Sequence, residues 1–255
     1  AYHLIVADRF DEAYAAAIAG GDAARTHGLD RRFGPHFNAA AIDALFRSGR
    51  WDEATQLVEV GKGRAPGGIG SLYLEAAIAR WLGARGSTAE ARAIVDPLVE
   101  LAHDDIDADV AAFVRLVDAE LANDEDRADR AVTAVTAGLD RLAGGDDKVL
   151  VAPLGAAGLR AAADRAERAR ALRRPDDVEE ALAEGAIVRA RLEALWRDAP
   201  PTTASARGYR AQCLAEAGRL AATSEPLAWR AAAEAWAVLP MPYPMAYARF
   251  REAEG

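Results

Sequence analysis

The residues best suited to chemistry form an acidic stretch, His103-Asp104-Asp105-Ile106-Asp107-Ala108-Asp109. Alternate aspartates are typical of a calcium-binding loop, but the position that needs a turn glycine is Val110 and the twelfth position is Leu116. The aspartate-rich magnesium motif of all-helical terpenoid synthases is not met either, because Ala108 stands where its third aspartate should be. Acidic side chains stabilise a helix N-terminus by ~0.3–1 kcal/mol each. We therefore predict that this stretch caps a helix and binds no metal.

Two glycine-containing segments and the single cysteine are the other candidates for a reactive or ligand-binding site. Gly61-Lys62-Gly63 lacks the hydroxyl residue and the upstream glycine of a phosphate-binding loop, and neither it nor Gly68-Ile69-Gly70 follows a strand. Cys213 stands alone in an apolar helical pattern, which is typical of a small core residue. The four histidines are His3, His27, His36 and His103. None lies four residues from another, so the sequence predicts no catalytic, cofactor-binding or metal-ligating residue.

Charge argues against nucleic acid as a direct partner. The chain carries 31 basic and 40 acidic residues, a formal net charge of −9, whereas phosphate binding requires a basic face. One segment is rich in arginine, with Arg160, Arg165, Arg168, Arg170, Arg173 and Arg174. The segment after it is acidic, with Asp176, Asp177, Glu179, Glu180 and Glu184. We expect these two segments to form antiparallel helices that make ion pairs with each other.

An aromatic cluster near residue 240 is the strongest candidate for a docking surface. Trp229 and Trp236 lie seven residues apart on one face of a predicted helix, and residues at that spacing usually belong to the core. The helix that follows has no partner helix after it, so part of its aromatic face is expected to stay uncovered. The predicted partner-docking residues are Tyr243, Tyr247 and Phe250.

Helical periodicity runs along almost the whole chain. Apolar residues recur at i, i+3 and i+4, as at Ala41, Ile42, Leu45 and Phe46. The most strand-like segment, 149–151, is too short to form a sheet. The segments predicted as helices are 1–7, 10–27, 35–48, 51–62, 70–84, 87–103, 106–122, 125–143, 151–173, 176–197, 202–221, 225–238 and 242–254. Glycine and proline clusters mark the turns between them.

A short motif recurs along the first half of the chain at intervals of 37–41 residues. Arg9-Phe10-Asp11-Glu12-Ala13 returns as Arg50-Trp51-Asp52-Glu53-Ala54, and weaker copies end at Ala91 and Ala128. The residues five positions before these alanines are Asp8, Gly49, Gly86 and Asn123. Such residue types tolerate the left-handed backbone that ends one helix before a tight turn into the next. Each unit is therefore predicted to be a helical hairpin that buries its apolar stripe by stacking on its neighbour.

Together these patterns predict an all-α fold. It is a right-handed α-solenoid of about thirteen helices in antiparallel hairpins, similar to tetratricopeptide repeats. We expect a single helical-repeat domain over 1–255, with regular repeats in 1–145, longer and less regular helices in 146–200, and a repeat-like hairpin plus an unpaired last helix in 201–255. The apolar share of 51% and the charged share of 28% are those of an ordinary globular protein.

The start of the chain and its hydropathy bear on location. No apolar run approaches the ~18 uncharged residues that a membrane span needs. The chain begins Ala1-Tyr2-His3, with neither an initiator Met nor a secretory pattern. We expect a cytoplasmic protein of which this chain is a fragment.

Packing motifs in the sequence resemble those of a known family. His27-Gly28-Leu29-Asp30-Arg31 and the segment from Ala44 to Ala54 resemble the repeat region of large LuxR-type transcriptional regulators of actinobacteria. The more specific matches are Cys213-Leu214-Ala215-Glu216, Ala228 to Trp236, and Pro242 to Phe250. The resemblance spans nearly the whole chain in the same order, and its motifs carry no chemistry.

In that family, an N-terminal ATPase module and a C-terminal DNA-binding helix-turn-helix flank a long tetratricopeptide-like segment. The resemblance implies that this chain is the non-catalytic middle segment, which senses an inducer or a partner protein and restrains or releases both ends. Its expected partners are those two domains of the same polypeptide, neither of which is present here, and an unidentified protein or small-molecule inducer. No cofactor, no membrane and no direct nucleic-acid contact is expected, and homo-oligomerisation is left open. Two alternatives stand: a helical-repeat adaptor unrelated to transcription, and an all-helical enzyme whose acidic residues converge only in space.

Overall fold

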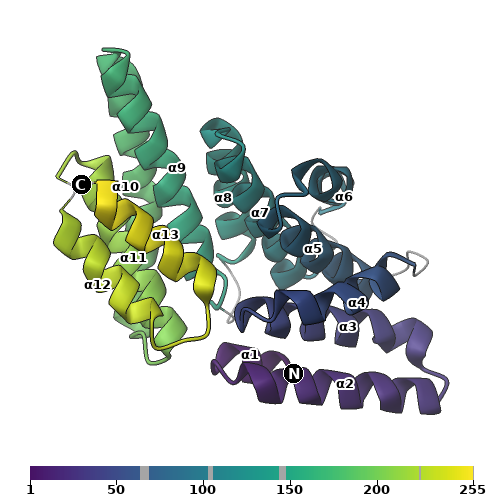
Figure 1. The fold of residues 1–255 in the computed structure, drawn as a ribbon. Helices are drawn as coiled ribbons and strands as arrows, with labels where there is room; N and C mark the ends of the chain where they lie inside the picture. Colours follow the sequence, from purple (N-terminus) through teal and green to yellow (C-terminus); the bar gives the residue numbers. More distant parts are fainter. Residues whose placement is uncertain (64–68, 103–105, 144–147, 224, 255) are drawn as a thin grey trace. The chain divides into compact units, whose positions relative to one another are not determined.

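The computed structural model describes residues 1–63, 69–102, 106–143, 148–223 and 225–254 (Figure 1). These described residues form thirteen α-helices and no strand, which confirms the all-α prediction. The first helices are α1 (Tyr2–Val6), α2 (Phe10–Thr26), α3 (Asp30–Arg47), α4 (Trp51–Lys62), α5 (Ile69–Ala84), α6 (Thr88–Leu101) and α7 (Ala108–Asp124). The others are α8 (Ala128–Arg141), α9 (Val151–Ala171), α10 (Pro175–Asp198), α11 (Ala204–Leu220), α12 (Pro226–Trp236) and α13 (Pro242–Glu254). None of these described helices combines the length and the apolarity that a bilayer crossing requires.

The chain forms two compact units, Ala1–Val117 and Asp118–Gly255, and the boundary between them falls inside α7. In the first unit, α3 packs against α2, α4 and α5, and α5 also packs against α6. In the second unit, α9 packs against α8, α10 and α11, and α12 packs between α11 and α13 in chain order. The main contacts in each unit therefore join helices that are one or two places apart along the chain. The predicted subdivision of one repeat domain at 145 and 200 stays a prediction.

The same backbone turn ends seven of the described helices. In each turn, a left-handed residue donates its N–H to the carbonyl three residues earlier, and the next residue donates to the carbonyl five residues earlier. Asp8, for example, donates to Ile5 (3.1 Å), and Arg9 donates to Leu4 (2.8 Å). This pair of bonds is the Schellman motif, which satisfies the carbonyls at a helix end. The left-handed residues of the described chain are Asp8, Gly28, Gly49, Gly86, Asp126, Arg173 and Ala222.

The sequence predicts three of these turns correctly and misplaces a fourth. The confirmed positions are Asp8, Gly49 and Gly86. The prediction for Asn123 is wrong, because this residue lies inside α7 with its side chain buried and its Nδ2 donating to the carbonyl of Ala157 (3.0 Å). The turn is made by Asp126 instead, so the fourth copy of the motif is shifted by three residues and its buried alanine is Ala131.

Helix α3 begins at Asp30, five residues before the predicted start at Pro35. The turn at Gly28 makes Leu29 the N-cap, and the Leu29 carbonyl accepts the N–H of Arg32 (3.0 Å). Pro35 consequently lies one turn inside the helix, where its missing N–H removes a single backbone bond. A proline near a helix start is therefore an imprecise marker of the first residue.

Ala222 is the least favourable residue among these turns, since it holds a φ of 57° without the freedom of glycine. We expect Ala222→Gly to raise the free energy of unfolding by about 0.5–1 kcal/mol, because removing the Cβ relieves strain worth about 1–2 kcal/mol and adds some unfolded-chain entropy. Urea unfolding followed by circular dichroism measures the change. Ala221→Gly is the matched control, since Ala221 has a φ of −80° and its replacement should not stabilise the chain. Equal gains in stability from both changes would contradict the assignment of backbone strain to Ala222.

Candidate functional site

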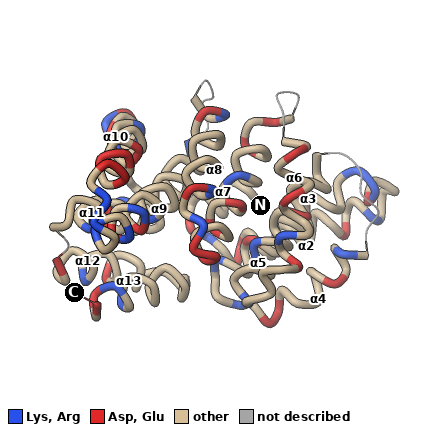
Figure 2. The backbone as a smooth tube through the Cα atoms, turned by 90° about the horizontal axis from the view of Figure 1, so that it is seen from above, with Lys and Arg blue, Asp and Glu red and all other residues tan. Residues whose placement is uncertain are grey.

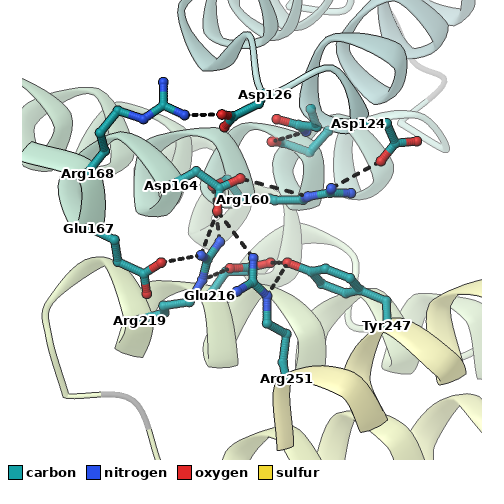
Figure 3. Close-up of polar contacts among 12 residues, drawn as sticks. Asp124, Asp126, Arg160, Asp164, Glu167, Arg168, Glu216, Arg219, Tyr247 and Arg251 are labelled. Carbon is teal, nitrogen blue, oxygen red and sulfur yellow. Dashed lines mark hydrogen bonds and ion pairs between the residues drawn. The ribbon is translucent and has the colours of Figure 1, made fainter. Parts of the chain in front are cut away.

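Charged and aromatic side chains from three helices of the second unit meet in one network (Figure 3). Spacings of three and four residues place the members from each helix on a common face. The members are Arg160, Asp164 and Glu167 of α9, Glu216 and Arg219 of α11, and Tyr247 and Arg251 of α13. We call this set the α9–α11–α13 network.

Glu216 is the most deeply buried member, with 0% of its surface exposed. Its Oε1 accepts the hydroxyl of Tyr247 (2.6 Å), and its Oε2 accepts Nε–H of Arg219 (2.9 Å). Burial raises the pKa of the Glu216 carboxyl, and the two hydrogen bonds and the positive charge of Arg219 oppose that rise. Both oxygens of this carboxylate are therefore held by partners within the protein.

Arg219 is the centre of the network and is itself buried. Besides Glu216, its Nη1 donates to Asp164 (2.6 Å) and Glu167 (2.8 Å), and its Nη2 donates to the carbonyl of Arg160 (3.2 Å). Burial opposes the charged form, but Glu216 and the other acidic partners outweigh it and raise the pKa of this guanidinium above its usual value. The planar fork of arginine suits such simultaneous contacts, which a lysine could not make.

The ring of Tyr247 lies between two further arginines. The guanidinium carbons of Arg160 and Arg251 lie 4.9 Å and 5.4 Å from the ring centroid, within the range of cation–π attraction. Arg251 also donates to Asp164 (3.3 Å), and Arg160 donates to Asp124 (3.0 Å). Burial, and then the charge of Glu216, raise the pKa of the Tyr247 hydroxyl, so it remains a hydrogen-bond donor at neutral pH.

The contacts of this network suit it to hold helices together. Asp164 accepts from two arginines and Glu216 accepts from an arginine and a tyrosine, so the buried charges are matched by opposite charges. Such a network fixes the register of three helices, because sliding one of them would leave a buried charge without its partner. Its carboxylates accept hydrogen bonds from other side chains of the protein, and these contacts hold α9, α11 and α13 together.

A smaller buried ion-pair group lies in the first unit. Asp43 of α3 accepts from Arg47 (2.9 Å) on the same helix and from Arg80 of α5 (3.4 Å). The guanidinium of Arg80 also covers the ring of Phe46 at 4.7 Å. All three charged side chains are buried, so this group connects α3 to α5 in the same way that the larger network connects its helices.

Each unit also contains a groove between neighbouring helices. The groove of the first unit lies among α2, α3 and α4 and has a volume of about 300 Å³. The groove of the second unit lies between α10 and α11, over α9, and has a volume of about 370 Å³. We call the second one the α10–α11 groove. Both are large enough for a small molecule or for side chains of a bound protein.

The three predicted docking residues lie in different surroundings. Tyr243 is 42% exposed and its hydroxyl donates to Asp124 (3.2 Å), whereas Phe250 is 57% exposed with Arg251 near its ring. Tyr247 is half-buried in the network and packs edge-on against Trp229 at 5.8 Å. The structure therefore joins Tyr247 to the buried network and leaves Tyr243 and Phe250 at the surface. A partner that docks on them stays a prediction.

The other sequence candidates take structural places. His103, Asp104 and Asp105 lie outside the described residues. Asp107 caps α7, since its Oδ1 accepts the N–H groups of Asp109 (3.1 Å) and Val110 (3.3 Å), which confirms the capping interpretation for that residue. Within the described parts of the chain, no three His, Cys, Asp or Glu side chains are grouped as a metal site would need.

Cys213 and Lys62 also have defined surroundings. Cys213 is buried in the core, as predicted, and burial raises the pKa of its thiol, which disfavours the reactive thiolate. Lys62 is the last residue of α4 and pairs with Glu59 (3.2 Å) and Glu90 (3.3 Å). The segment 64–68, which includes Gly68, lies outside the described residues.

The arginine-rich helix α9 pairs with α10 only in part. Arg165 contacts Glu180 (3.1 Å) and Glu184 of α10, as predicted, and also Asp129 of α8 (3.0 Å). The prediction is wrong for Arg160 and Arg168, which pair with acidic residues near the turn between α7 and α8. The reason is that α9 packs against α8 as well as α10, so its arginines face two sides. Figure 2 shows acidic and basic residues together on α10 and α11.

The sequence patterns did not predict the α9–α11–α13 network, although the sequence contains one signal of it. Glu216 occupies a position on α11 three residues after the buried Cys213, and it lies on the same apolar face. A charged residue on an apolar helix face is seldom left without a partner, and Arg219 stands three residues further on. The remaining partners come from α9 and α13, which only the folded chain brings close.

Comparison of the chain with protein-family models, with curated proteins and with solved structures gave no match.

Proposed function

We propose that the chain is a regulatory, non-catalytic segment of a LuxR-type transcriptional regulator and binds a partner protein or a small-molecule inducer. In this proposal its helical hairpins form a right-handed, tetratricopeptide-like solenoid. Binding in a groove between helices changes how the segment restrains the ATPase and helix-turn-helix domains of the same polypeptide. The resemblance of its packing motifs to that family supplies the link to transcription.

The observation that carries the proposal is the repeated turn between successive helices. Seven described helices end in the same Schellman motif, and the main contacts join helices one or two places apart. Elements that pack mainly on sequence neighbours are typical of solenoids, whose stacked repeats leave open grooves for partners. The two inter-helical grooves, of about 300 and 370 Å³, fit this description.

The buried ion pairs support a scaffold that transmits a signal. In both units, charged side chains on one helix are matched by charges on helices two to four places away along the chain. A ligand that shifts one helix must therefore shift its partners or break a buried pair, which costs several kcal/mol. That coupling suits a segment that passes a binding event to adjoining domains.

The proposal is tested on the isolated chain and on the parent protein. We expect the isolated chain neither to hydrolyse ATP nor to shift duplex DNA at physiological salt, since those activities are assigned to the neighbouring domains. We expect a parent protein that lacks this segment to keep ATP hydrolysis but to lose its control by the inducer or partner. Activity of the isolated chain in either assay would contradict the proposal. A reading frame that continues past Gly255 without a basic helix-turn-helix would favour the adaptor alternative.

A further inference from the structure

We infer that the α10–α11 groove binds a small aromatic carboxylic acid, with the ring system against Trp196 and the carboxylate on Arg210. The inference gives the proposed sensing role a site and a ligand class, and it rests on that role for its biological meaning. Four features of the groove carry it: its floor, its charged mouth, its size and an exposed leucine at its edge.

The groove has an apolar floor. It exists because α10 and α11 both pack on α9 but make few contacts with each other. Helices α10 and α11 both pack along α9, and they come close at Gly185, where a Cβ atom would lie 2.2 Å from Leu220. Between them, the buried side chains of Leu159, Leu192 and Cys213 line the groove. A floor of this kind favours an apolar ring over a sugar or another strongly hydrated ligand.

The mouth of the groove carries more positive than negative charge. The Arg210 guanidinium lies 5.7 Å from the centroid of the Trp196 ring, and no ion pair of Arg210 is found among the described residues. Arg189 also lines the groove, and its contact with Glu193 is long (3.4 Å) and more than half exposed. An exposed pair of this kind is weak, so the Arg189 side chain can turn to a ligand at little cost.

These charges select an anion, and the geometry selects a carboxylate beside a flat ring. The lining of the groove includes two guanidinium groups, those of Arg189 and Arg210, and one carboxylate, that of Glu193, although the chain as a whole has a net charge of −9. Arginine binds carboxylates with two parallel hydrogen bonds, and an indole ring stacks on aromatic groups. A ligand ring placed beside Trp196 would put a short carboxylate arm within reach of Arg210.

Size and exposure agree with this occupant. Small-molecule pockets measure about 300–1,000 Å³, and a groove of about 370 Å³ lies near the lower end, which leaves room for a fused two-ring acid. Leu214 lines the groove but is 60% exposed, an arrangement that a bound apolar ring would relieve.

The probe is 2-naphthoate, titrated into the chain in a calorimeter, with 2-naphthalenemethanol as the uncharged analogue of the same ring size. For a ligand of this size we expect a Kd of about 0.1–1 mM and at least about tenfold weaker binding of the alcohol. Arg210→Ala should weaken naphthoate binding about tenfold and leave the alcohol unchanged. Arg207→Ala is the matched control on the same helix; Arg207 is not a lining residue and donates to the carbonyl of Thr202 (2.6 Å), so its loss should not affect binding.

Two groove variants keep the test decisive. Ala217→Trp should fill the groove and abolish binding, and thermal unfolding checks that the variant folds. Leu214→Asp, at an exposed position, should weaken naphthoate binding by repulsion even if Ala217→Trp fails to fold. The inference is overturned if naphthoate does not bind at 5 mM, about five times the upper end of the expected Kd range, if the alcohol binds equally well, or if Arg210→Ala and Arg207→Ala behave alike. Such a result concerns the groove alone, because the regulatory proposal is tested by ATP hydrolysis and DNA binding.

Discussion

Arg219→Met should lower the free energy of unfolding by about 3–5 kcal/mol, although it replaces one long side chain with another. The change leaves the fully buried Glu216 without its charged partner and deprives Asp164 and Glu167 of a shared donor. An unpaired charge in the interior costs more than the lost contacts, because the group keeps its desolvation penalty and loses its compensation. Urea unfolding at pH 7, followed by circular dichroism, measures the loss.

The loss should depend on pH in the direction expected when buried carboxylates, Glu216 above all, lose their charged partner. Burial already raises the pKa of this carboxyl, and removing Arg219 removes the strongest influence that lowers it. A carboxyl whose pKa is raised by folding binds its proton more tightly in the folded state than in the unfolded state. Its contribution to stability is therefore complete below the unfolded pKa of about 4.3 and is lost as the pH rises through the folded pKa. The difference between wild type and Arg219→Met should shrink as the pH falls from 8 to 4.

Two controls separate a buried-charge effect from a general effect of losing an arginine. Adding Glu216→Leu to Arg219→Met should recover most of the loss, because replacing a buried pair by apolar groups is often nearly neutral. Arg230→Met removes an arginine that pairs with Glu252 at 2.7 Å but is 54% exposed, so it should change stability little. If the exposed and buried arginines gave equal losses, or if the double variant were less stable than Arg219→Met, the network would not have the role assigned to it.

The sequence predicts helices and some turns well because both depend on local properties. Gly49 and Gly86 mark helix ends because glycine adopts a left-handed backbone without steric cost. Arg173 and Ala222 adopt the same conformation with no such preference, so nothing in their residue types indicates the turn. At those two positions the packing of the helices on either side outweighs local preference.

The candidate site depends on non-local contacts, which is why the sequence did not reveal it. In the sequence, Glu216 and Arg219 stand three residues apart on a helix, a spacing that exposed ion pairs share, so the apolar face of Glu216 is the one local sign of burial. Their burial follows from Asp164, which stands 55 residues before Arg219, and from Tyr247, which stands 31 residues after Glu216. The α10–α11 groove likewise depends on how far apart two helices lie on α9, which residue types alone do not specify.

Trp236→Ala should lower the free energy of unfolding by about 3–5 kcal/mol, the usual cost of removing a large buried side chain. The Trp236 ring is fully buried, meets Tyr209 edge-on at 4.8 Å, and donates its Nε1–H to Gln212 (3.2 Å). It lies directly on Gly208 of α11, where a Cβ atom would come within 2.6 Å of the ring. The glycine and the tryptophan therefore form one close contact between α11 and α12.

This contact predicts that Gly208→Leu destabilises the wild-type chain but stabilises the Trp236→Ala variant. Gly208→Leu alone should destabilise the chain by at least about 1–3 kcal/mol, because the rigid indole cannot move aside. With Trp236→Ala the same leucine enters the space left by the ring, so the double variant should be more stable than Trp236→Ala alone. Unfolding measurements on the four proteins give the coupling energy directly. Additive losses would contradict the contact, whereas a gain from Gly208→Leu in the alanine background that exceeds the ~1 kcal/mol helix-propensity advantage of leucine over glycine would show that the two positions share one space.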